Sequence, residues 1–440
     1  MADHARSADP AVQAQLDRLS MLSPGRDVLG LERITALLDR LGRPDRALPP
    51  VLHVAGTNGK GSTCAFLRAA IEAAGLTAHV FTSPHLVRFN ERIRLAGRLI
   101  EDRLLADLLG EVLDVADGIA PSFFEATTAA AFLAFARTPA DACIIEVGLG
   151  GRLDATNVIE RPLVCGIAQL GLDHQAFLGD RIEQIAAEKA GIAKRDVPLV
   201  SLHYPRLLAD TIGQVAREAG APWSPKGGTW DAVVYLGRLH YRDRDGKIDL
   251  PIPTLAGAHQ ASNAALATAM LRAQHVLPVP PSALRAAMGW AQWPARLQRL
   301  EAGPLHDMLP PGCELWIDGG HNPNAARALA DHFRGSLRVG SRLHIILGML
   351  ENKDAAGFLA PFRDSGAMVH AVPVPGHAHH SPEALVIIAR AQGLEAAIAA
   401  DPLAALRAIA PAEPEAATVL IGGSLYLAGS ALSENGTPPT

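Results

Sequence analysis

The ten residues VAGTNGKGST, from Val54 to Thr63, decide which kind of fold this chain can form. They follow the apolar run PPVLHVAG and precede GSTCAFLRAAIEAAG, whose apolar residues have helical spacing. A glycine-rich turn between a strand and a helix is typical of a phosphate-binding loop. The usual loop reads G-x-x-x-x-G-K-[ST], whereas here Gly61 separates Lys60 from Ser62. The stretch predicts an α/β nucleotide-binding domain whose phosphate loop departs from the usual sequence motif.

The residue types in this loop suit a nucleotide phosphate. Gly56, Gly59 and Gly61 permit positive φ angles and a close approach of the backbone to a ligand. Amides at a helix N-terminus bind anions, and Lys60 adds a positive charge for the β- and γ-phosphates. Ser62, or the hydroxyl after it, can hold magnesium. The alternative is a tight turn with a solvated lysine, which leaves this combination at one strand–helix junction unexplained.

Composition narrows the class of protein. The chain has 440 residues, 49% of them hydrophobic, and a net charge of −5, so we expect two or three domains and no nucleic-acid or membrane partner. Its four cysteines are scattered without a C-x-x-C pair, which favours a reduced, cytoplasmic protein. The N-terminus lacks the apolar core of a signal peptide, and the apolar run 126–136 is too short to span a bilayer.

Strand and helix patterns alternate along the chain and predict two α/β domains. Apolar runs at TAHVFTS, DACIIEVG, RPLVCGIAQ and VPLVSLH alternate with helical patterns, which indicates a parallel sheet covered by helices. Residues 223–256 read as a small antiparallel sheet. A helix ends before Pro294, and the α/β rhythm then restarts. We therefore predict domains at 1–295 and 296–430 and a tail at 431–440, in which we expect SENGTPPT (residues 433–440) to be disordered.

Polar residues follow three of the predicted strands. Ser83 lies just past the second strand, Glu146 ends an apolar strand, and His174 follows the next one. A carboxylate at such a place is costly unless it is paired with a cation, and magnesium prefers oxygen ligands. The carboxyl ends of parallel strands share one edge, where ligands bind. We predict a magnesium–nucleotide site there; a salt bridge of Glu146 to an arginine is the alternative.

Several longer strings resemble one family. They are GTNGKGS, SPHLVRFNERI (Ser83–Ile93), GGRLDATN (Gly150–Asn157) and HQASNAA (His259–Ala265). Together with WPARLQ, WIDGGHNPNAARAL and GMLENKD, they are similar in order to the Mur-type ATP-dependent ligases, above all their folate branch. The resemblance covers about residues 20–430. It implies an α/β protein with an N-terminal P-loop parallel-sheet ATPase domain of Mur-ligase type and a smaller C-terminal Rossmann-like α/β domain.

The resemblance also implies a reaction. A substrate carboxylate attacks the γ-phosphate of ATP, and the amine of L-glutamate then attacks the acyl phosphate to form an amide. The implied acceptors are dihydropteroate and reduced folates, and the implied cofactors are ATP, two magnesium ions and, as a further candidate, a monovalent cation. The family is usually monomeric, so we expect a monomer.

The resemblance assigns roles to residues that match its motifs. Nucleotide contacts fall on Thr57, Asn58, Gly59, Lys60, Gly61, Ser62, Asn263, Arg296, Asp318 and His321. Metal contacts fall on Ser62, Ser83, Glu146, His174 and Lys189. The dihydropteroate site falls on Ser122, Phe124, Glu125, Leu153, Asp154 and Ala155. Catalytic roles fall on Lys60, His174, Lys189 and Arg296.

Two segments read differently with and without the resemblance. By composition Lys189 is an exposed helix lysine beside Glu188, whereas in the family the matching lysine is buried and carbamylated and binds a second magnesium ion. FFEATT and RLDATN offer aromatic faces and carboxylates that suit a pterin ring, although core packing also explains the phenylalanines. His377, His379 and His380 suggest a metal, but we interpret them as a polar loop.

Three alternatives stay open at this point. The chain could have kept only the folylpolyglutamate synthase activity. A muropeptide-forming Mur ligase would share the loop, the lysine and the hinge, but has no reason to carry SPHLVRFNERI and GGRLDATN. A P-loop switch or regulatory ATP-binding module would hydrolyse ATP slowly without forming an amide.

Overall fold

The computed structural model describes residues 5–22, 29–337, 341–412 and 417–440, which form two compact units. One unit holds the described residues up to Thr254 together with Gln260–Gln292. The other holds Leu255–His259 and the described part of Trp293–Pro439. The chain thus passes into the second unit twice. The last passage, between Gln292 and Trp293, lies next to the predicted boundary at residue 296, whereas the short excursion at 255–259 was not predicted.

The first unit is built on a large, mostly parallel sheet. Among the described residues its strand order is β4-β3-β2-β5-β1-β6-β7-β8. Only β3 and β4 run antiparallel to their neighbours. The bounds are β1 (Val51–Ala55), β2 (Ala78–Phe81), β3 (Ile93–Leu95), β4 (Arg98–Leu99), β5 (Ala142–Glu146), β6 (Val164–Ile167), β7 (Leu199–Ser201) and β8 (Trp223–Pro225). Because β1 lies between β5 and β6, the segments that follow these three strands meet at one sheet edge.

The predicted parallel sheet is confirmed, with one correction. Trp223–Pro225, expected in the small antiparallel sheet, pairs in parallel with β7 and extends the main sheet as β8. The small antiparallel sheet itself is present and is formed by β9 (Trp230–Tyr235), β10 (Arg238–Asp243) and β11 (Gly246–Pro251). The sequence pattern misplaced β8 because a three-residue strand is too short to show whether its alternation belongs to one sheet or the other.

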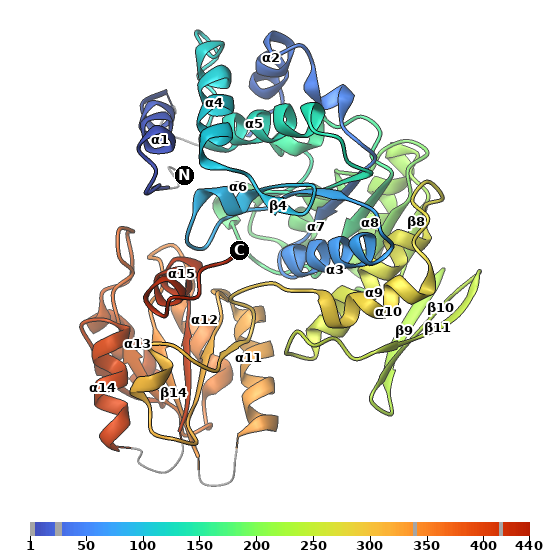
Figure 1. Ribbon diagram of the computed structural model, residues 1–440. Coiled ribbons are helices and arrows are strands. Elements are labelled where there is room, and N and C mark those ends of the chain that lie inside the picture. Colours follow the sequence, from blue (N-terminus) through green and yellow to red (C-terminus); the bar gives the residue numbers. More distant parts are fainter. Residues whose placement is uncertain (1–4, 23–28, 338–340, 413–416) are drawn as a thin grey trace. The chain divides into compact units, whose positions relative to one another are not determined.

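Along the chain the helices of the first unit are interspersed with these strands (Figure 1). Their bounds are α1 (Pro10–Leu22), α2 (Glu32–Arg40), η1 (Pro44–Ala47), α3 (Lys60–Ala73), η2 (Phe89–Arg92), α4 (Asp102–Asp114), α5 (Phe123–Arg137), η3 (Ala155–Val158), α6 (Gln175–Leu178), α7 (Ile182–Ala190), α8 (Arg206–Ala219), α9 (His259–Arg272) and α10 (Pro281–Trp290). Helix α9 begins in the short excursion and continues in the first unit. None of the described helices is long and apolar enough to cross a membrane.

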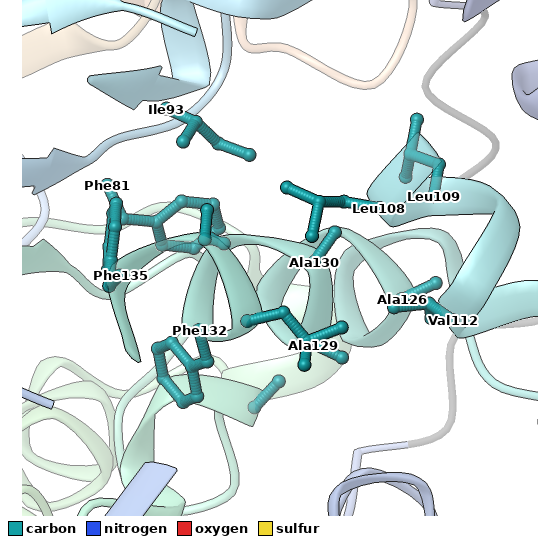
Figure 2. Close-up of a cluster of buried hydrophobic side chains, with 14 of the residues drawn as sticks. Phe81, Ile93, Leu108, Leu109, Val112, Ala126, Ala129, Ala130, Phe132 and Phe135 are labelled. Atoms are coloured by element: carbon teal, nitrogen blue, oxygen red, sulfur yellow. The ribbon is translucent and has the colours of Figure 1, made fainter. Parts of the chain in front are cut away.

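Helix α5 forms the centre of the main core cluster of this unit. Its sequence FFEATTAAAFLAFAR is apolar on nearly every face, as expected of a helix that is covered on all sides. Figure 2 shows Phe135 of this helix near Phe81 of β2, with Leu108 and Val112 of α4 close to its small residues; Phe132 belongs to the same cluster. The alanines of α5 let α4 approach closely, and the capping box of Ser122 and Glu125 fixes the start of the helix at Phe123.

The second unit is a smaller α/β domain, as predicted. Its described strands have the order β12-β13-β17-β14-β15-β16, and only β12 is antiparallel. The strands are β12 (Gln298–Leu300), β13 (Glu314–Ile317), β14 (Arg342–Leu347), β15 (Met368–Ala371), β16 (Glu395–Ile398) and β17 (Ala417–Gly422). The helices are η4 (His306–Met308), α11 (Pro323–Ser336), α12 (Ala355–Leu359), η5 (Ala360–Phe362), α13 (Pro382–Ala391), α14 (Pro402–Ala412) and α15 (Leu425–Glu434).

The prediction that SENGTPPT (residues 433–440) is disordered is wrong at its start. Helix α15 continues to Glu434, and Asn435 is buried. The side chain of Asn435 donates to the carbonyl of Ala302 at 2.9 Å and accepts from the amide of Leu305 at 3.1 Å. These bonds hold the end of the chain to the same unit.

Replacing Phe132 by alanine should lower the free energy of unfolding by about 3–5 kcal/mol, because a fully buried ring leaves a cavity in the α5 cluster. Urea denaturation followed by circular dichroism measures the change. Leu236→Ala is the matched control, since Leu236 is 82% exposed and its removal should cost less than about 0.5 kcal/mol. Similar losses in both variants would contradict the assignment of α5 to the core.

Candidate nucleotide and substrate site

The predicted phosphate loop lies between β1 and α3. Strand β1 ends at Ala55 and helix α3 begins at Lys60, so Gly56–Gly59 form the turn. The amides of Thr57 and Asn58 donate to the carbonyl of Gln169 at 2.8 and 3.1 Å, and the Thr57 hydroxyl donates to the carbonyl of Gly171 at 3.0 Å. The loop is therefore held against the segment that follows β6.

The phosphate loop has no space for a side chain at position 59. Gly59 has a φ of 83°, and a Cβ there would lie 2.3 Å from Oδ1 of Asn263. Asn263 is buried and its amide nitrogen donates to Gln260 Oε1 at 3.0 Å, which orients its oxygen toward Gly59. The first amides of α3 have no acceptor within the helix. A glycine at the start of the helix and the amides of its first turn fit a phosphate group.

Lys60 and Glu146 meet beside this loop. The Lys60 amine donates to the carbonyl of Gly56 at 3.1 Å and lies 3.9 Å from Glu146 Oε1. The amide of Ser83 donates to Glu146 Oε2 at 3.2 Å. The structure therefore brings Ser83, Glu146 and Lys60 together, and a lysine of the phosphate loop lies beside Glu146.

The donor set beside the loop suits a hard cation. Thr63 donates its hydroxyl to the carbonyl of Gly59 at 2.8 Å, so Ser62 is the better placed of the two candidate hydroxyls. The described residues contain no group of three or more His, Cys, Asp or Glu side chains that could hold a metal. A magnesium ion here would depend on Glu146, hydroxyl groups and phosphate oxygens, which is the mixed oxygen set that it prefers. His174 has a left-handed backbone, with a φ of 52°, and its Nε2 lies 4.0 Å from Asp173 Oδ2.

Lys189 is not the exposed lysine that composition predicted. Its side chain is buried at the end of α7, and its amine donates to the carbonyl of Gly56 at 2.9 Å. Burial, and then the charge of Lys60, lower the pKa of Lys189 to about 7. Two lysines thus share one carbonyl oxygen of the phosphate loop. Composition missed this, because a helix lysine next to a glutamate is usually solvated.

The predicted substrate residues of α5 have structural partners. The hydroxyl of Ser122 accepts from the amide of Glu125 at 3.2 Å, and Glu125 Oε2 accepts from the amide of Ser122 at 2.6 Å. Glu125 Oε2 also accepts from Arg33 Nε at 3.0 Å. This is a capping box, whose S-x-x-E spacing could have been read from the sequence. The hydrogen bond from Arg33 could not have been read from the sequence, because 92 residues separate Arg33 from Glu125.

Asp154 organises the loop in which it lies. Its Oδ2 accepts from the amide of Leu149 at 2.8 Å, and its Oδ1 accepts from the amide and hydroxyl of Thr156 at 3.0 and 2.6 Å. Burial raises the pKa of Asp154, although these donors act in the opposite direction. Leu153 on one side is partly buried and Ala155 on the other is buried. The loop was predicted as a substrate contact; its internal hydrogen bonds were not predicted.

Phe124 lies over this loop. A Cβ added to Gly148 would be 2.4 Å from the Cζ atom of Phe124, so the ring packs directly on the backbone of that glycine. The ring of Phe81 lies 5.8 Å from it, centroid to centroid. Phe124 is partly buried, unlike Phe123 beside it, which is buried among Phe89 and Arg92. One face of an aromatic side chain is therefore fixed by the loop.

The second unit contains its own cluster of predicted residues. Asp318 Oδ2 accepts from the amide of Leu297 at 2.7 Å, and Oδ1 accepts from the amide of Gly320 at 2.6 Å. Arg296 donates to the carbonyl of Ala295 at 2.8 Å. His321 Nδ1 lies 3.0 Å from the carbonyl oxygen of Gly319. The Asp318 carboxylate thus ties the segment of Arg296 to the turn that carries His321.

The three histidines of GHAHHSP have separate contacts. The ring of His377 stacks on Tyr426 with centroids 3.7 Å apart. His379 Nδ1 lies 2.6 Å from the carbonyl oxygen of His377, and His380 Nε2 lies 2.9 Å from that of Lys353. These contacts join the loop to GMLENKD through its backbone, in keeping with a polar loop.

The comparisons with known proteins agree with this geometry. Residues 306–425 match the Mur ligase, glutamate ligase domain. The dihydrofolate synthase/folylpolyglutamate synthase of Escherichia coli (strain K12) is 37% identical over 333 residues, which cover 76% of this chain and 74% of the relative. The folylpolyglutamate synthase of Lacticaseibacillus casei is 34% identical over 419 residues, with 90% and 92% covered.

Solved structures give the same result. The E. coli FolC in complex with DHPP and ADP has a TM-score of 0.86 and 32% identity, with 97% of each chain covered. A bifunctional folylpolyglutamate synthase/dihydrofolate synthase with Mn, AMPPNP and L-glutamate bound has a TM-score of 0.82 and 29% identity, with 97% of this chain and 99% of that chain covered. Fold and site define a Mur-type, ATP-dependent ligase. The chain belongs to the dihydrofolate synthase/folylpolyglutamate synthase family, the folate branch of these ligases.

Gly59→Ala should weaken ATP binding at least about tenfold, because the added Cβ would meet Asn263 in the phosphate loop. Titration calorimetry with a non-hydrolysable ATP analogue and magnesium measures the dissociation constant. Gly75→Ala is the matched control: its φ is similarly positive, at 79°, but a Cβ there meets nothing within 4 Å. Unchanged ATP affinity in Gly59→Ala would contradict the assignment of this loop.

Proposed function

We propose that this chain adds L-glutamate to dihydropteroate and to reduced folates in an ATP-dependent reaction that passes through an acyl phosphate. The observation that carries the proposal is the convergence at Gly56, whose carbonyl accepts hydrogen bonds from both Lys60 and Lys189. The phosphate loop is thus surrounded by the amines of Lys60 and Lys189 and by the buried carboxylate of Glu146. In the same unit, the ring of Phe124 packs on Gly148. The family relationship supports the same reaction.

The residues of the first unit suit the phosphoryl-transfer step. Lys60 places a positive charge at the N-terminus of α3, where it neutralises negative charge that develops on the transferred group. Ser62, Ser83, Glu146 and His174 are the proposed ligands of magnesium, which when bound would polarise phosphate oxygens. We propose that two magnesium ions and one monovalent cation bind with ATP. Thr57, Asn58, Gly61 and Asn263 complete the proposed nucleotide contacts.

The second unit supplies Arg296, Asp318 and His321 to the proposal. Asp318 holds the Arg296 segment and the His321 turn in one arrangement, as its two hydrogen bonds show. We propose that Arg296 contacts the ATP phosphates and that Asp318 and His321 contact ATP or the substrate. An acyl phosphate hydrolyses in water, so its site must exclude solvent before the glutamate amine attacks.

The dihydropteroate activity rests on Phe124 and on the loop of residues 148–157. Phe124 offers a ring face for stacking on a flat pterin, and its other side is supported by Gly148. Ser122, Glu125, Leu153, Asp154 and Ala155 belong to this proposed surface. Because Glu125 and Asp154 already accept several internal hydrogen bonds, we propose that they act mainly by holding the shape of the surface.

Incubation with magnesium, ATP and L-glutamate tests the function directly. We expect mass spectrometry to show the gain of one glutamate on dihydropteroate in one tube and on a reduced folate in another. Lys60→Met is the control that should form neither product, because the phosphate loop loses its charge. A gain on the folate alone would indicate a folylpolyglutamate synthase only. No gain with either acceptor would favour a muropeptide ligase, or a regulatory ATPase if ATP is still consumed.

Carbamylation of Lys189 is part of the proposal. Its pKa of about 7 makes a neutral amine available near neutrality, and only a neutral amine reacts with carbon dioxide. The product would carry a carboxylate beside the phosphate loop that could bind a second magnesium ion. The hydrogen bond of the Lys189 amine to the Gly56 carbonyl, which Lys60 also binds, supports a role for such a group beside Glu146 and Lys60.

After depletion of carbon dioxide, activity should fall and should return when carbon dioxide is added. At equal dissolved carbon dioxide the recovery should be roughly an order of magnitude faster at pH 8 than at pH 6, because the neutral fraction of Lys189 rises as the pH passes its pKa of about 7. Lys189→Gln should show no recovery at either pH. A recovery rate that is independent of pH would contradict the proposal.

The remaining parts of the proposal concern organisation. We propose that residues 1–295 bind ATP and folate and that residues 296–430 form a glutamate-ligase domain. We also propose a monomer in the cytoplasm. Four free, buried cysteines among the described residues favour a reducing compartment.

A further inference from the structure

His53 is a buried residue that the proposed chemistry does not use. It lies in β1, three residues before Gly56, with no exposed surface. Its Nε2 atom is 2.8 Å from the Thr156 hydroxyl, which joins the central strand to the loop of residues 148–157. Its Nδ1 atom is buried and has no hydrogen-bond partner among the described residues. Burial and the charge of Lys194 lower the pKa of His53 to about 3, so the ring is neutral.

The hydrogen bonds around Thr156 have a defined direction. Its hydroxyl is 2.6 Å from Asp154 Oδ1, an oxygen that also accepts from the Thr156 amide and that is the acceptor in this pair. Thr156 therefore donates to Asp154, and its oxygen accepts from the N–H of His53 Nε2. This arrangement assigns the proton of the neutral ring to Nε2 and leaves Nδ1 bare, in agreement with the absence of a described partner there.

The bonds continue from Asp154 to the surface under Phe124. The second oxygen of Asp154 accepts from the amide of Leu149 at 2.8 Å, which closes the loop next to Gly148. Phe124 rests on Gly148, where a Cβ would meet its ring at 2.4 Å. A shift of Asp154 would thus change the height of the backbone on which the aromatic ring lies.

We propose that His53 is a positioning residue for the pterin-binding surface: through Thr156 it holds Asp154, and with it the loop that supports Phe124. The inference rests on the proposed dihydropteroate activity. It assigns His53 no contact with a substrate. The competing view is that His53 and Thr156 only fill the core.

Two pairs of variants separate these views. His53→Leu removes the donor, and Thr156→Val removes the hydroxyl while leaving the backbone amide that also binds Asp154. His53→Gln and Thr156→Ser retain the donor and the hydroxyl. We expect KM for dihydropteroate to rise about tenfold in the first pair and less than about threefold in the second, because only the first leaves Asp154 without its relay. KM for ATP should stay within about twofold in all four, because the hydrogen bonds of His53 and Thr156 described above run to the loop of residues 148–157 and not to the phosphate loop.

His79→Leu provides a matched control. His79 is likewise fully buried in the same sheet, on β2, where it stacks on Phe135 and bonds to the carbonyl of Thr138 and the amide of Ala96. Its loss should lower the melting temperature without changing KM for dihydropteroate. If His53→Leu behaves in the same way, the proposal is overturned.

The double variant His53→Leu/Thr156→Val gives a second test. In one relay the two changes break the same connection, so the double variant should raise KM for dihydropteroate no more than either single change. If the two changes instead multiply their effects on KM for dihydropteroate, the proposal is overturned.

If His53→Leu does not fold, the comparison of Thr156→Val with Thr156→Ser still tests the proposal. Wild-type protein without activity on dihydropteroate would overturn the proposed function and this inference together, whereas an active wild type with unaffected variants would overturn this inference alone.

Discussion

The carbonyl oxygen of Gly56 is the constraint on which the site depends. It accepts from Lys60 of the phosphate loop and from Lys189 of a helix far along the chain. Two amines at one oxygen repel each other when both are charged, and burial makes the charge of Lys189 more costly still. The fold accepts this arrangement because strand β1 is enclosed by β5 and β6, which leaves the end of the strand little freedom. A lysine with a lowered pKa follows from that packing.

On the substrate side of the site, the polar side chains bind backbone amides of the protein even without a ligand. Glu125 closes a capping box and binds Arg33, Asp154 closes its own loop, and Asp318 ties two segments of the second unit. Each carboxylate is at least partly removed from water, so each needs donors. Surfaces built in this way are rigid before substrate arrives, which reduces the cost of ordering them on binding.

Local patterns were sufficient for the elements and for most of the motifs. The strand–turn–helix around VAGTNGKGST, the buried helix α5 and the restart of the α/β rhythm after Pro294 were predictable, because apolar spacing and glycine position act over short distances. Strand β8 and the excursion at 255–259 were not, because a few residues carry too little pattern. The end of the chain was misjudged because its polar composition does not reveal the bonds of Asn435 to Ala302 and Leu305.

By itself the sequence determined the class of fold, the phosphate loop and the strings that mark the folate branch of the Mur ligases, since these are written in contiguous residues. Only the tertiary structure decided that Lys189 is buried, that Lys60 lies beside Glu146, and that His53 connects through Thr156 to Asp154. Those relations join residues of distant segments. Burial and hydrogen-bond direction, which set the pKa of a lysine or the tautomer of a histidine, exist only once the sheet has brought these segments together.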